Sequence, residues 1–391
     1  MVNAGTGSTC AIANDRLWCW GSNGRGQLGN KTNTNAINAA VAVNVLKTDL
    51  TELAGPIKQV SNSVQGNHSC AIDASNQLWC WGFNIYGQLG IGTQATDPDG
   101  AMNAANSNYA QRVKIDATTF LTDITTVSTG LQSTCAIAAL GKVYCWGASW
   151  FGETGQEGGS PPTVNPYATV VNASAGVPLT GFTKISVGQR HSCGMKDGNV
   201  WCWGLNDIGE LGNGSNNNSR FPVQVKKVGG TNLTGVTNMS VGQYHGCATT
   251  TDQTMWCWGN NEYGQLGLGT ASSAVTLATQ VLQKAGVSLS GVQDISLGGS
   301  HTCARLSTGI WCWGQNLMGQ LGDGSKTQRN YPVKVMLASG AVLSGVTWIS
   351  PGKQHTCAVA NSKAICWGLN DTGQLGDNTT INKVKAIING L

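Results

Sequence analysis

The segment 188–212, GQRHSCGMKDGNVWCWGLNDIGELG, recurs in variant form seven times and constrains the fold more than any other feature. Each copy has the skeleton G-x-x-(H/S)-x-C, a short apolar stretch, a turn of two or three residues, and then a segment close to C-W-G-x-N-x-x-G-Q-L-G. When Cys193 is placed opposite Cys202, Asp197-Gly198 remains between the two strands, and Asp-Gly is strongly favoured in two-residue hairpin turns. The repeat therefore predicts a β-hairpin followed by a glycine-rich turn.

The same register places two cysteines opposite each other in every repeat. Three repeats carry one extra residue, which lengthens the turn, as in Ala139-Leu140-Gly141, and leaves the cysteines facing each other. We therefore predict seven cross-strand disulfides, one per repeat: Cys10–Cys19, Cys70–Cys80, Cys135–Cys145, Cys193–Cys202, Cys247–Cys257, Cys303–Cys312 and Cys357–Cys366. Such pairing is typical of an oxidising compartment. The alternative, a reduced cytosolic protein with buried thiols, does not explain regular facing pairs.

Both faces of the hairpin carry side chains that need burial. Because side chains alternate along a strand, the cysteines lie on one face and Trp201 and Trp203 on the other. A further strand is expected before each hairpin, as at 184–187, and another after each glycine-rich turn, as at 222–225. Seven four-stranded units can bury both faces by closing into a ring.

We therefore predict an all-β fold, a seven-bladed β-propeller with four-stranded blades and one cross-strand disulfide per blade. The first cysteine recurs every 54 to 65 residues, a spacing typical of such arrays. Residues 1–391 are expected to form a single propeller with the approximate repeats 1–55, 56–122, 123–180, 181–234, 235–290, 291–344 and 345–391.

The H-x-C-A … W-G-x-N-x-x-G-Q-L-G pattern resembles the repeat of the regulator of chromosome condensation family, also called alpha-tubulin suppressor-like, over essentially the whole chain. The resemblance implies the seven-bladed propeller and carries over no catalytic residue, because the family's repeat motif is structural. The eukaryotic founder exchanges nucleotide on a small GTPase and binds chromatin, but this sequence shows neither a basic N-terminal tail nor a match to the exchange wedge, and its paired cysteines depart from that intracellular member. Secreted bacterial relatives use the fold to bind proteins, one as a beta-lactamase inhibitor.

The family also includes the plant ultraviolet-B photoreceptor, which senses light with tryptophan. Most of the 14 tryptophans here occupy fixed repeat positions, and we interpret them as packing between blades.

Composition narrows the partners and the compartment. Charged residues make up 11% of the chain, and the net charge of +4 is not concentrated in a Lys/Arg cluster, so neither nucleic acid nor an anionic membrane is an expected partner. No apolar run is long enough for membrane insertion. A signal peptide is not visible after Met1, and we expect a mature or excised domain whose secreted or cell-surface localisation rests on the cysteine pairing.

Candidate chemistry is sparse. Five histidines, His68, His191, His245, His301 and His355, lie two residues before a repeat's first cysteine. A zinc site is not expected, because Ser8 and Ser133 replace two of these histidines and facing cysteines bond each other; each ring is instead expected to hydrogen-bond backbone between blades. No catalytic residue, metal or cofactor is predicted, since no nucleophile elbow, metalloprotease helix or P-loop is present.

Four carboxylates lie in or beside the glycine-rich turns: Asp207, Glu210, Glu262 and Asp371. Blades bring distant residues together, so a pair of them could converge across the funnel, but we interpret them as solvated. Asp97 and Asp99 with Asn103 could hold calcium, but a terminal acidic ligand is lacking, and a proline-containing turn is the plainer interpretation.

The loops of repeats 1 to 3 are irregular, and equivalent loops project from one face of a ring, where binding usually occurs. Trp150 and Phe151 are interpreted as lying outside the repeat frame and as exposed. The candidate binding-loop residues are Asp97, Asp99, Asn103, Trp150, Phe151, Glu153 and Glu157. The alternative is neutral drift in loops that tolerate insertion.

The sequence thus predicts a secreted or cell-surface recognition and adhesion module, not an enzyme, that binds a protein or glycan on an extracellular surface through loops of one propeller face. The alternative is a structural subunit of an extracellular fibre or oligomer that binds copies of itself.

Overall fold

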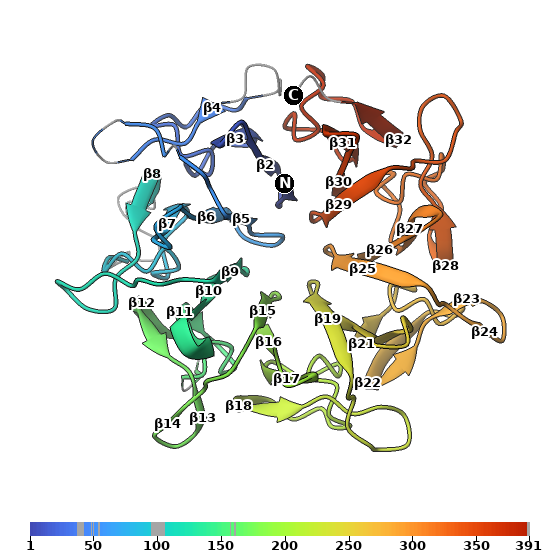
Figure 1. The fold of residues 1–391 in the computed structure, drawn as a ribbon, viewed down its shortest axis with the longest axis horizontal. Coiled ribbons are helices and arrows are strands. Elements are labelled where there is room, and N and C mark those ends of the chain that lie inside the picture. The colour runs from blue at the N-terminus through green and yellow to red at the C-terminus, as the bar shows by residue number, and fades with distance from the viewer. Residues whose placement is uncertain are drawn as a thin grey trace.

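Seven four-stranded antiparallel sheets surround a central axis, and each contributes its first strand to the centre of the ring (Figure 1). The computed structural model describes residues 1–36, 43–47, 49, 51–53, 55–94, 106–156, 158–159 and 162–388. Within these ranges the only helical element is one 3-10 turn, η2 (Ala139–Gly141). The predicted all-β, seven-bladed propeller is confirmed.

The blades follow the order of the chain. The first four contain β1 (Val2–Ala4), β2 (Ser8–Ala13), β3 (Arg16–Gly21) and β4 (Val43–Asn44); β5 (Gln59–Asn62), β6 (His68–Ile72), β7 (Leu78–Gly82) and β8 (Ser107–Arg112); β9 (Thr126–Thr129), β10 (Ser133–Ala138), β11 (Lys142–Ser149) and β12 (Thr163–Val170); and β15 (Lys184–Val187), β16 (His191–Lys196), β17 (Asn199–Gly204) and β18 (Ser219–Gln224).

The last three blades are built in the same way. They contain β19 (Val236–Val241), β20 (His245–Thr250), β21 (Met255–Asn261) and β22 (Ser272–Gln280); β25 (Val292–Leu297), β26 (His301–Leu306), β27 (Gly309–Gly314) and β28 (Arg329–Lys334); and β29 (Val346–Pro351), β30 (His355–Ala360), β31 (Lys363–Gly368) and β32 (Lys383–Ile388). Two short hairpins connect blades: β13 (Asn172–Ser174) with β14 (Val177–Pro178), and β23 (Leu282–Lys284) with β24 (Val287–Ser288).

The central hairpin of each blade has the predicted register. Cys193 lies opposite Cys202, and the turn residues Asp197 and Gly198 have φ values of 50° and 68°, the two positive angles that a tight two-residue hairpin requires. Each blade carries one disulfide between its second and third strands, with the seven predicted pairings, and all cysteine side chains are fully buried.

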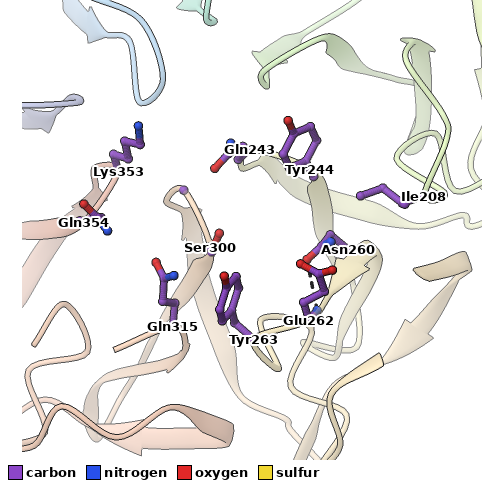
Figure 2. Close-up of a pocket in the computed structure, with 11 residues that line it drawn as sticks. Ile208, Gln243, Tyr244, Asn260, Glu262, Tyr263, Ser300, Gln315, Lys353 and Gln354 are labelled. Carbon is purple, nitrogen blue, oxygen red and sulfur yellow. Dashed lines mark hydrogen bonds between the residues drawn. The ribbon is translucent and has the colours of Figure 1, made fainter. Parts of the chain in front are cut away.

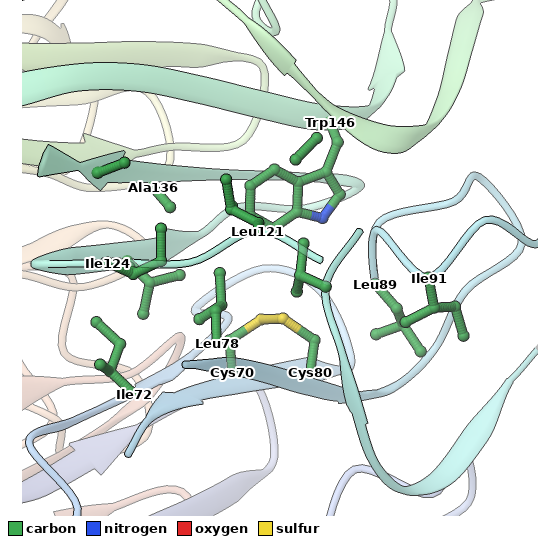
Figure 3. Close-up of a cluster of buried hydrophobic side chains, with 14 residues drawn as sticks. Cys70, Ile72, Leu78, Cys80, Leu89, Ile91, Leu121, Ile124, Ala136 and Trp146 are labelled. Atoms are coloured by element: carbon green, nitrogen blue, oxygen red, sulfur yellow. A yellow bond between two sulfur atoms is a disulfide. The ribbon is translucent and has the colours of Figure 1, made fainter. Parts of the chain in front are cut away.

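Each disulfide packs against a tryptophan of the following blade. Figure 3 shows the junction of blades 2 and 3, where Cys70–Cys80 and Leu78 lie on one side of an apolar cluster and Trp146 of β11 lies on the other. The same pairing of disulfide and tryptophan occurs in the six other apolar clusters. Both faces of the hairpin are therefore buried between neighbouring blades.

Polar contacts repeat at the same junctions. The indole N–H of Trp146 donates to the carbonyl of Gln88 in the preceding blade at 2.9 Å, and five other core tryptophans make the equivalent bond at 2.9–3.1 Å. Nearer the axis, the N–H of Val241 donates to Ser186 Oγ at 3.1 Å, and this contact also recurs around the ring. Two junctions differ: Asn3 Oδ1 replaces the serine hydroxyl and accepts the N–H of Asn62 at 2.6 Å, and after Ser296 the bond is missing because Pro351 has no N–H to donate.

Blade 7 meets blade 1 through the same set of contacts, and neither blade borrows a strand from the other. Trp20 donates to the carbonyl of Gln374 at 3.0 Å, and Trp348 donates to the carbonyl of Val2 at 2.8 Å. The ring is therefore closed by side-chain packing and hydrogen bonds between two complete blades (Figure 1).

Four of the five histidines, His68, His245, His301 and His355, contact a threonine hydroxyl of the following blade, so the expectation of histidine–backbone bonds is wrong. His301 Nε2 lies 2.8 Å from Thr356 Oγ1, and this hydroxyl donates its proton to the carbonyl of Gln320 at 2.9 Å. Nε2 must therefore carry the proton that His301 donates. Burial lowers the pKa of His301 to about 3, which keeps the ring neutral. His191 has no such partner, because Gly246 takes the position of the threonine in the following blade.

Candidate binding face

The two kinds of loop that the repeat motif encodes emerge at the same end of every blade. The connection from the first strand to the second, such as 188–190, and the connection from the third to the fourth, such as 205–218, lie on one side because neighbouring strands run antiparallel. The other side carries the hairpin turns such as Asp197-Gly198. We call the first side the turn face. It includes the described parts of the two connections that carry the candidate binding-loop residues, 83–94 and 106 in blade 2 and 150–156, 158–159 and 162 in blade 3.

The asparagine of the W-G-x-N motif holds each glycine-rich turn together. Asn206 Oδ1 accepts the N–H of Leu211 at 2.9 Å, while Asn206 Nδ2 donates to the carbonyls of Ser215 and Asn217 at 2.9 and 3.0 Å. Equivalent asparagines make related contacts in the other blades except blade 3: Asn23, Asn84, Asn261, Asn316 and Asn370. Sequence reasoning missed this role, although the asparagine recurs in the motif.

Blade 3 follows the same frame with different residues. Ser149 takes the asparagine position, and the N–H of Gly155 donates to the carbonyl of Gly152, as in every other glycine-rich turn. Trp150 and Phe151 therefore occupy the positions of Asp207 and Ile208 in blade 4. The interpretation that Trp150 and Phe151 lie outside the repeat frame is wrong.

The glutamine of the Q-L-G turn, or the glutamate that replaces it, is an internal tie. Gln265 Oε1 accepts the N–H of Tyr263 at 2.9 Å. Glu153 is 2% exposed, and its two oxygens accept the N–H groups of Trp150 and Phe151 at 3.1 and 2.8 Å. Glu153 is thus occupied within the turn and is not accessible to a ligand, contrary to its prediction as a binding-loop residue.

Glu210 has the same role and is fully buried, so the interpretation that it is solvated is wrong. Its Oε2 accepts the N–H of Ile208 at 3.0 Å, and its Oε1 has no partner. Burial, with a smaller contribution from Asp207, raises the pKa of Glu210 from 4.5 to about 7. Asp207 and Glu262 are exposed, as expected.

We expect Glu210→Gln to stabilise the protein at high pH only. Between pH 4.5 and about 7 the folded chain keeps a proton that the unfolded chain has lost, so this group's contribution to stability is present at low pH and disappears as the pH rises through about 7. Glutamine avoids the buried charge, and we expect a gain of about 2–3 kcal/mol near pH 8.5 and almost none near pH 4.5. Urea unfolding at both pH values measures it.

The reciprocal change Gln265→Glu supplies the matched control. It places a carboxyl group at the same turn position of blade 5, where it should cost stability at high pH. A Glu210→Gln variant whose gain does not depend on pH would contradict this account of the buried carboxylate.

The other predicted binding residues divide into two groups. Asp97, Asp99, Asn103 and Glu157 lie outside the described residues. Trp150 and Phe151 are half-buried rather than exposed, and the guanidinium of Arg190 lies over both rings, with centroid distances of 5.0 and 5.4 Å.

A cavity of about 440 Å³ opens on the turn face across blades 4 to 7. Figure 2 shows its labelled side chains, contributed by loops of several blades and arranged around the opening. They include Tyr244, Tyr263, Gln315, Gln354, Glu262 and Lys353. The cavity lies outside the predicted binding sector of repeats 1 to 3. The residues that line the cavity occupy regular repeat positions, and only the fold brings them together, so the sequence pattern did not indicate them.

The lining of the cavity is mainly polar and aromatic. It presents amide groups, tyrosine rings, one carboxylate and one ammonium group, which bind ligands by hydrogen bonding and stacking. Within the described parts of the chain, no three His, Cys, Asp or Glu side chains gather in a way that could hold a metal ion. The same parts contain no helix long and apolar enough to cross a membrane.

The seven sheets and their repeated loops define a closed β-propeller. The chain belongs to the RCC1-like domain family, whose model matches residues 1–357. This membership confirms the resemblance found in the repeat motif.

Curated relatives share the domain across most of this chain. The human E3 ubiquitin-protein ligase HERC2 is 26% identical over 368 residues, which cover 93% of this chain and 7% of HERC2. The ultraviolet-B receptor UVR8 of Arabidopsis thaliana is 28% identical over 338 residues, 85% of this chain and 70% of UVR8. This chain thus spans a small part of HERC2.

Solved structures show the same fold. Prp20p from Saccharomyces cerevisiae superimposes with a TM-score of 0.72 at 18% identity, covering 97% of this chain and 87% of Prp20p.

Proposed function

We propose that this domain is a non-catalytic recognition module that binds another protein through its turn face. The observation that carries the proposal is the set of half-buried aromatic side chains on that face: Tyr86, Trp150, Phe151, Tyr244 and Tyr263. Aromatic residues and arginine are enriched among the residues that dominate protein–protein binding energies. Arg190 lies within the same set.

The relatives support protein binding by this fold. The structure of Prp20p was described together with its binding properties to Gsp1p and histones. HERC2 contains a domain of this family within a much longer ligase.

We further propose that the protein acts outside the cytosol, in a secreted or cell-surface context. The support is the complete pairing of its fourteen cysteines in buried disulfides. In that setting the partner is an extracellular protein, and the low charge does not favour nucleic acid.

The test compares matched variants on the two sides of the ring. The variant Tyr244→Ala/Tyr263→Ala removes two rings from the turn face. The control Leu140→Ala/Val228→Ala removes two exposed side chains, 92% and 62% exposed, from the opposite side. The immobilised, non-reduced domain is first used to capture a partner from cell-surface and secreted proteins. The partner is then purified, and the Kd of its complex with each variant is measured.

We expect the turn-face variant to weaken binding by about a hundredfold and the control by less than about threefold. Equal losses in both variants, or a loss in the control alone, would place binding elsewhere. Electron microscopy of the non-reduced protein over a concentration series separates the structural alternative, since stacks or fibres instead of single rings would indicate self-association.

A further inference from the structure

Arg190 is held on the turn face by aromatic rings. Its guanidinium lies over Trp150 at 5.0 Å and over Phe151 at 5.4 Å, and its Nε is buried without a hydrogen-bond partner. Tyr86 packs edge-on against Trp150 with a centroid distance of 6.4 Å, so the platform extends across blades 2 to 4. Stacking positions the guanidinium and leaves its hydrogen-bonding edge unused.

The acidic side chain of Glu153 interacts electrostatically with this cation but forms no ion pair with it in the described structure. Both Glu153 oxygens already accept backbone N–H groups. A second donor lies beside the platform. Gln132 Oε1 accepts the indole N–H of Trp150 at 2.9 Å, which leaves the Gln132 amide N–H₂ group to donate elsewhere.

From these contacts we infer that Arg190, Gln132 and the ring of Trp150 form a binding site for the carboxylate of an aspartate or glutamate side chain presented by the partner protein. The inference deepens the proposed function and rests on it. A guanidinium offers two parallel N–H groups to a carboxylate, and the rings pack against the apolar carbons beside it.

The charge of the site favours a carboxylate over a phosphate or a sulfated glycan. One cation faces the ligand, and burial raises the pKa of the nearby Glu153 carboxyl group, which favours its neutral form. A single negative charge matches this arrangement, whereas a dianion or a polysulfated chain requires several basic groups.

The probes are the peptides acetyl-Leu-Glu-Leu-amide and acetyl-Leu-Gln-Leu-amide, which differ in one charged group. Each is titrated into the non-reduced domain, and the indole N–H resonance of Trp150, assigned with Trp150→Phe, reports binding by NMR. A heparin hexasaccharide is titrated as the sulfated comparison.

We expect the Glu peptide to bind at least about tenfold more tightly than the Gln peptide, and Arg190→Gln to abolish the difference. Arg190→Lys keeps the charge but loses the two parallel N–H groups of the guanidinium, so it should retain only part of the difference in affinity between the two peptides. The control Arg25→Gln removes an equal charge from the same face, where Arg25 stacks on Phe83 at 5.3 Å, and should leave binding unchanged.

Three results would overturn the inference: equal binding of both peptides, no shift of the Trp150 resonance, or unchanged peptide binding by Arg190→Gln. Tighter binding of heparin at Trp150 would overturn it too and would assign the site to a sulfated glycan.

Binding of the partner protein separates the carboxylate site from the proposed function. If Tyr244→Ala/Tyr263→Ala weakens partner binding and Arg190→Gln does not, binding through the turn face is supported and the carboxylate site is contradicted. If neither variant affects partner binding, the proposed function itself fails.

Discussion

A variant in which all fourteen cysteines are alanine is expected not to reach the folded state. Each disulfide closes a loop with a sequence separation of 9 or 10 residues, which contributes about 2–3 kcal/mol by chain-entropy reasoning. Seven such contributions match or exceed the roughly 5–15 kcal/mol of net stability that is usual for a protein domain. Near-UV circular dichroism and gel filtration measure the outcome, namely loss of fixed aromatic packing and an expanded chain.

A single-bridge variant, Cys193→Ala/Cys202→Ala, provides the control. We expect it to fold and to lose about 2–4 kcal/mol in urea unfolding, because the other six bridges remain. A cysteine-free protein with native packing would show that the disulfides are dispensable, and it would remove the support for an oxidising compartment.

The second large effect is expected from Trp203→Ala. Trp203 is fully buried and packs against the disulfide Cys135–Cys145. Its indole N–H donates to the carbonyl of Glu153 at 3.1 Å. Truncation leaves a cavity at the junction of blades 3 and 4, and we expect a loss of about 3–5 kcal/mol in the free energy of unfolding.

Trp201→Ala is the matched control, since Trp201 lies two residues earlier on the same strand and is only half-buried. Its loss should be about 1 kcal/mol. Urea unfolding of the non-reduced proteins compares the two. Equal losses would contradict the view that the fully buried tryptophan of each blade holds the ring together.

The candidate site was less predictable than the fold. The sequence correctly predicted that equivalent loops project from one face of the ring, because loop order follows from an antiparallel sheet. Irregular loops are easy to recognise in a repeat sequence, and those of repeats 1 to 3 were therefore predicted to form the binding sector. The cavity around Tyr244 and Tyr263 lies at regular repeat positions, where nothing in the linear pattern sets these residues apart.

Glu153 shows the opposite error. A glutamate in an irregular glycine-rich loop suggests a residue that contacts a ligand. Glu153 instead replaces the glutamine whose side chain closes this turn in other blades. Aligning 146–155 with 203–212 residue by residue would have placed Trp150, Phe151 and Glu153 in the frame. The burial of Glu153 itself depends on the packing of blade 3 against blade 4 through Trp203.

The sequence by itself determined the blade. The spacing of paired cysteines, the hairpin turn and the alternation of side chains are local, and they specify the register of each sheet and the number of sheets. Only the tertiary structure decided which side chains meet across blades: the disulfide with the next tryptophan, His301 with Thr356, and Arg190 with Trp150. These contacts join residues about fifty positions apart, and their geometry is set by the closure of the ring, which no local pattern contains.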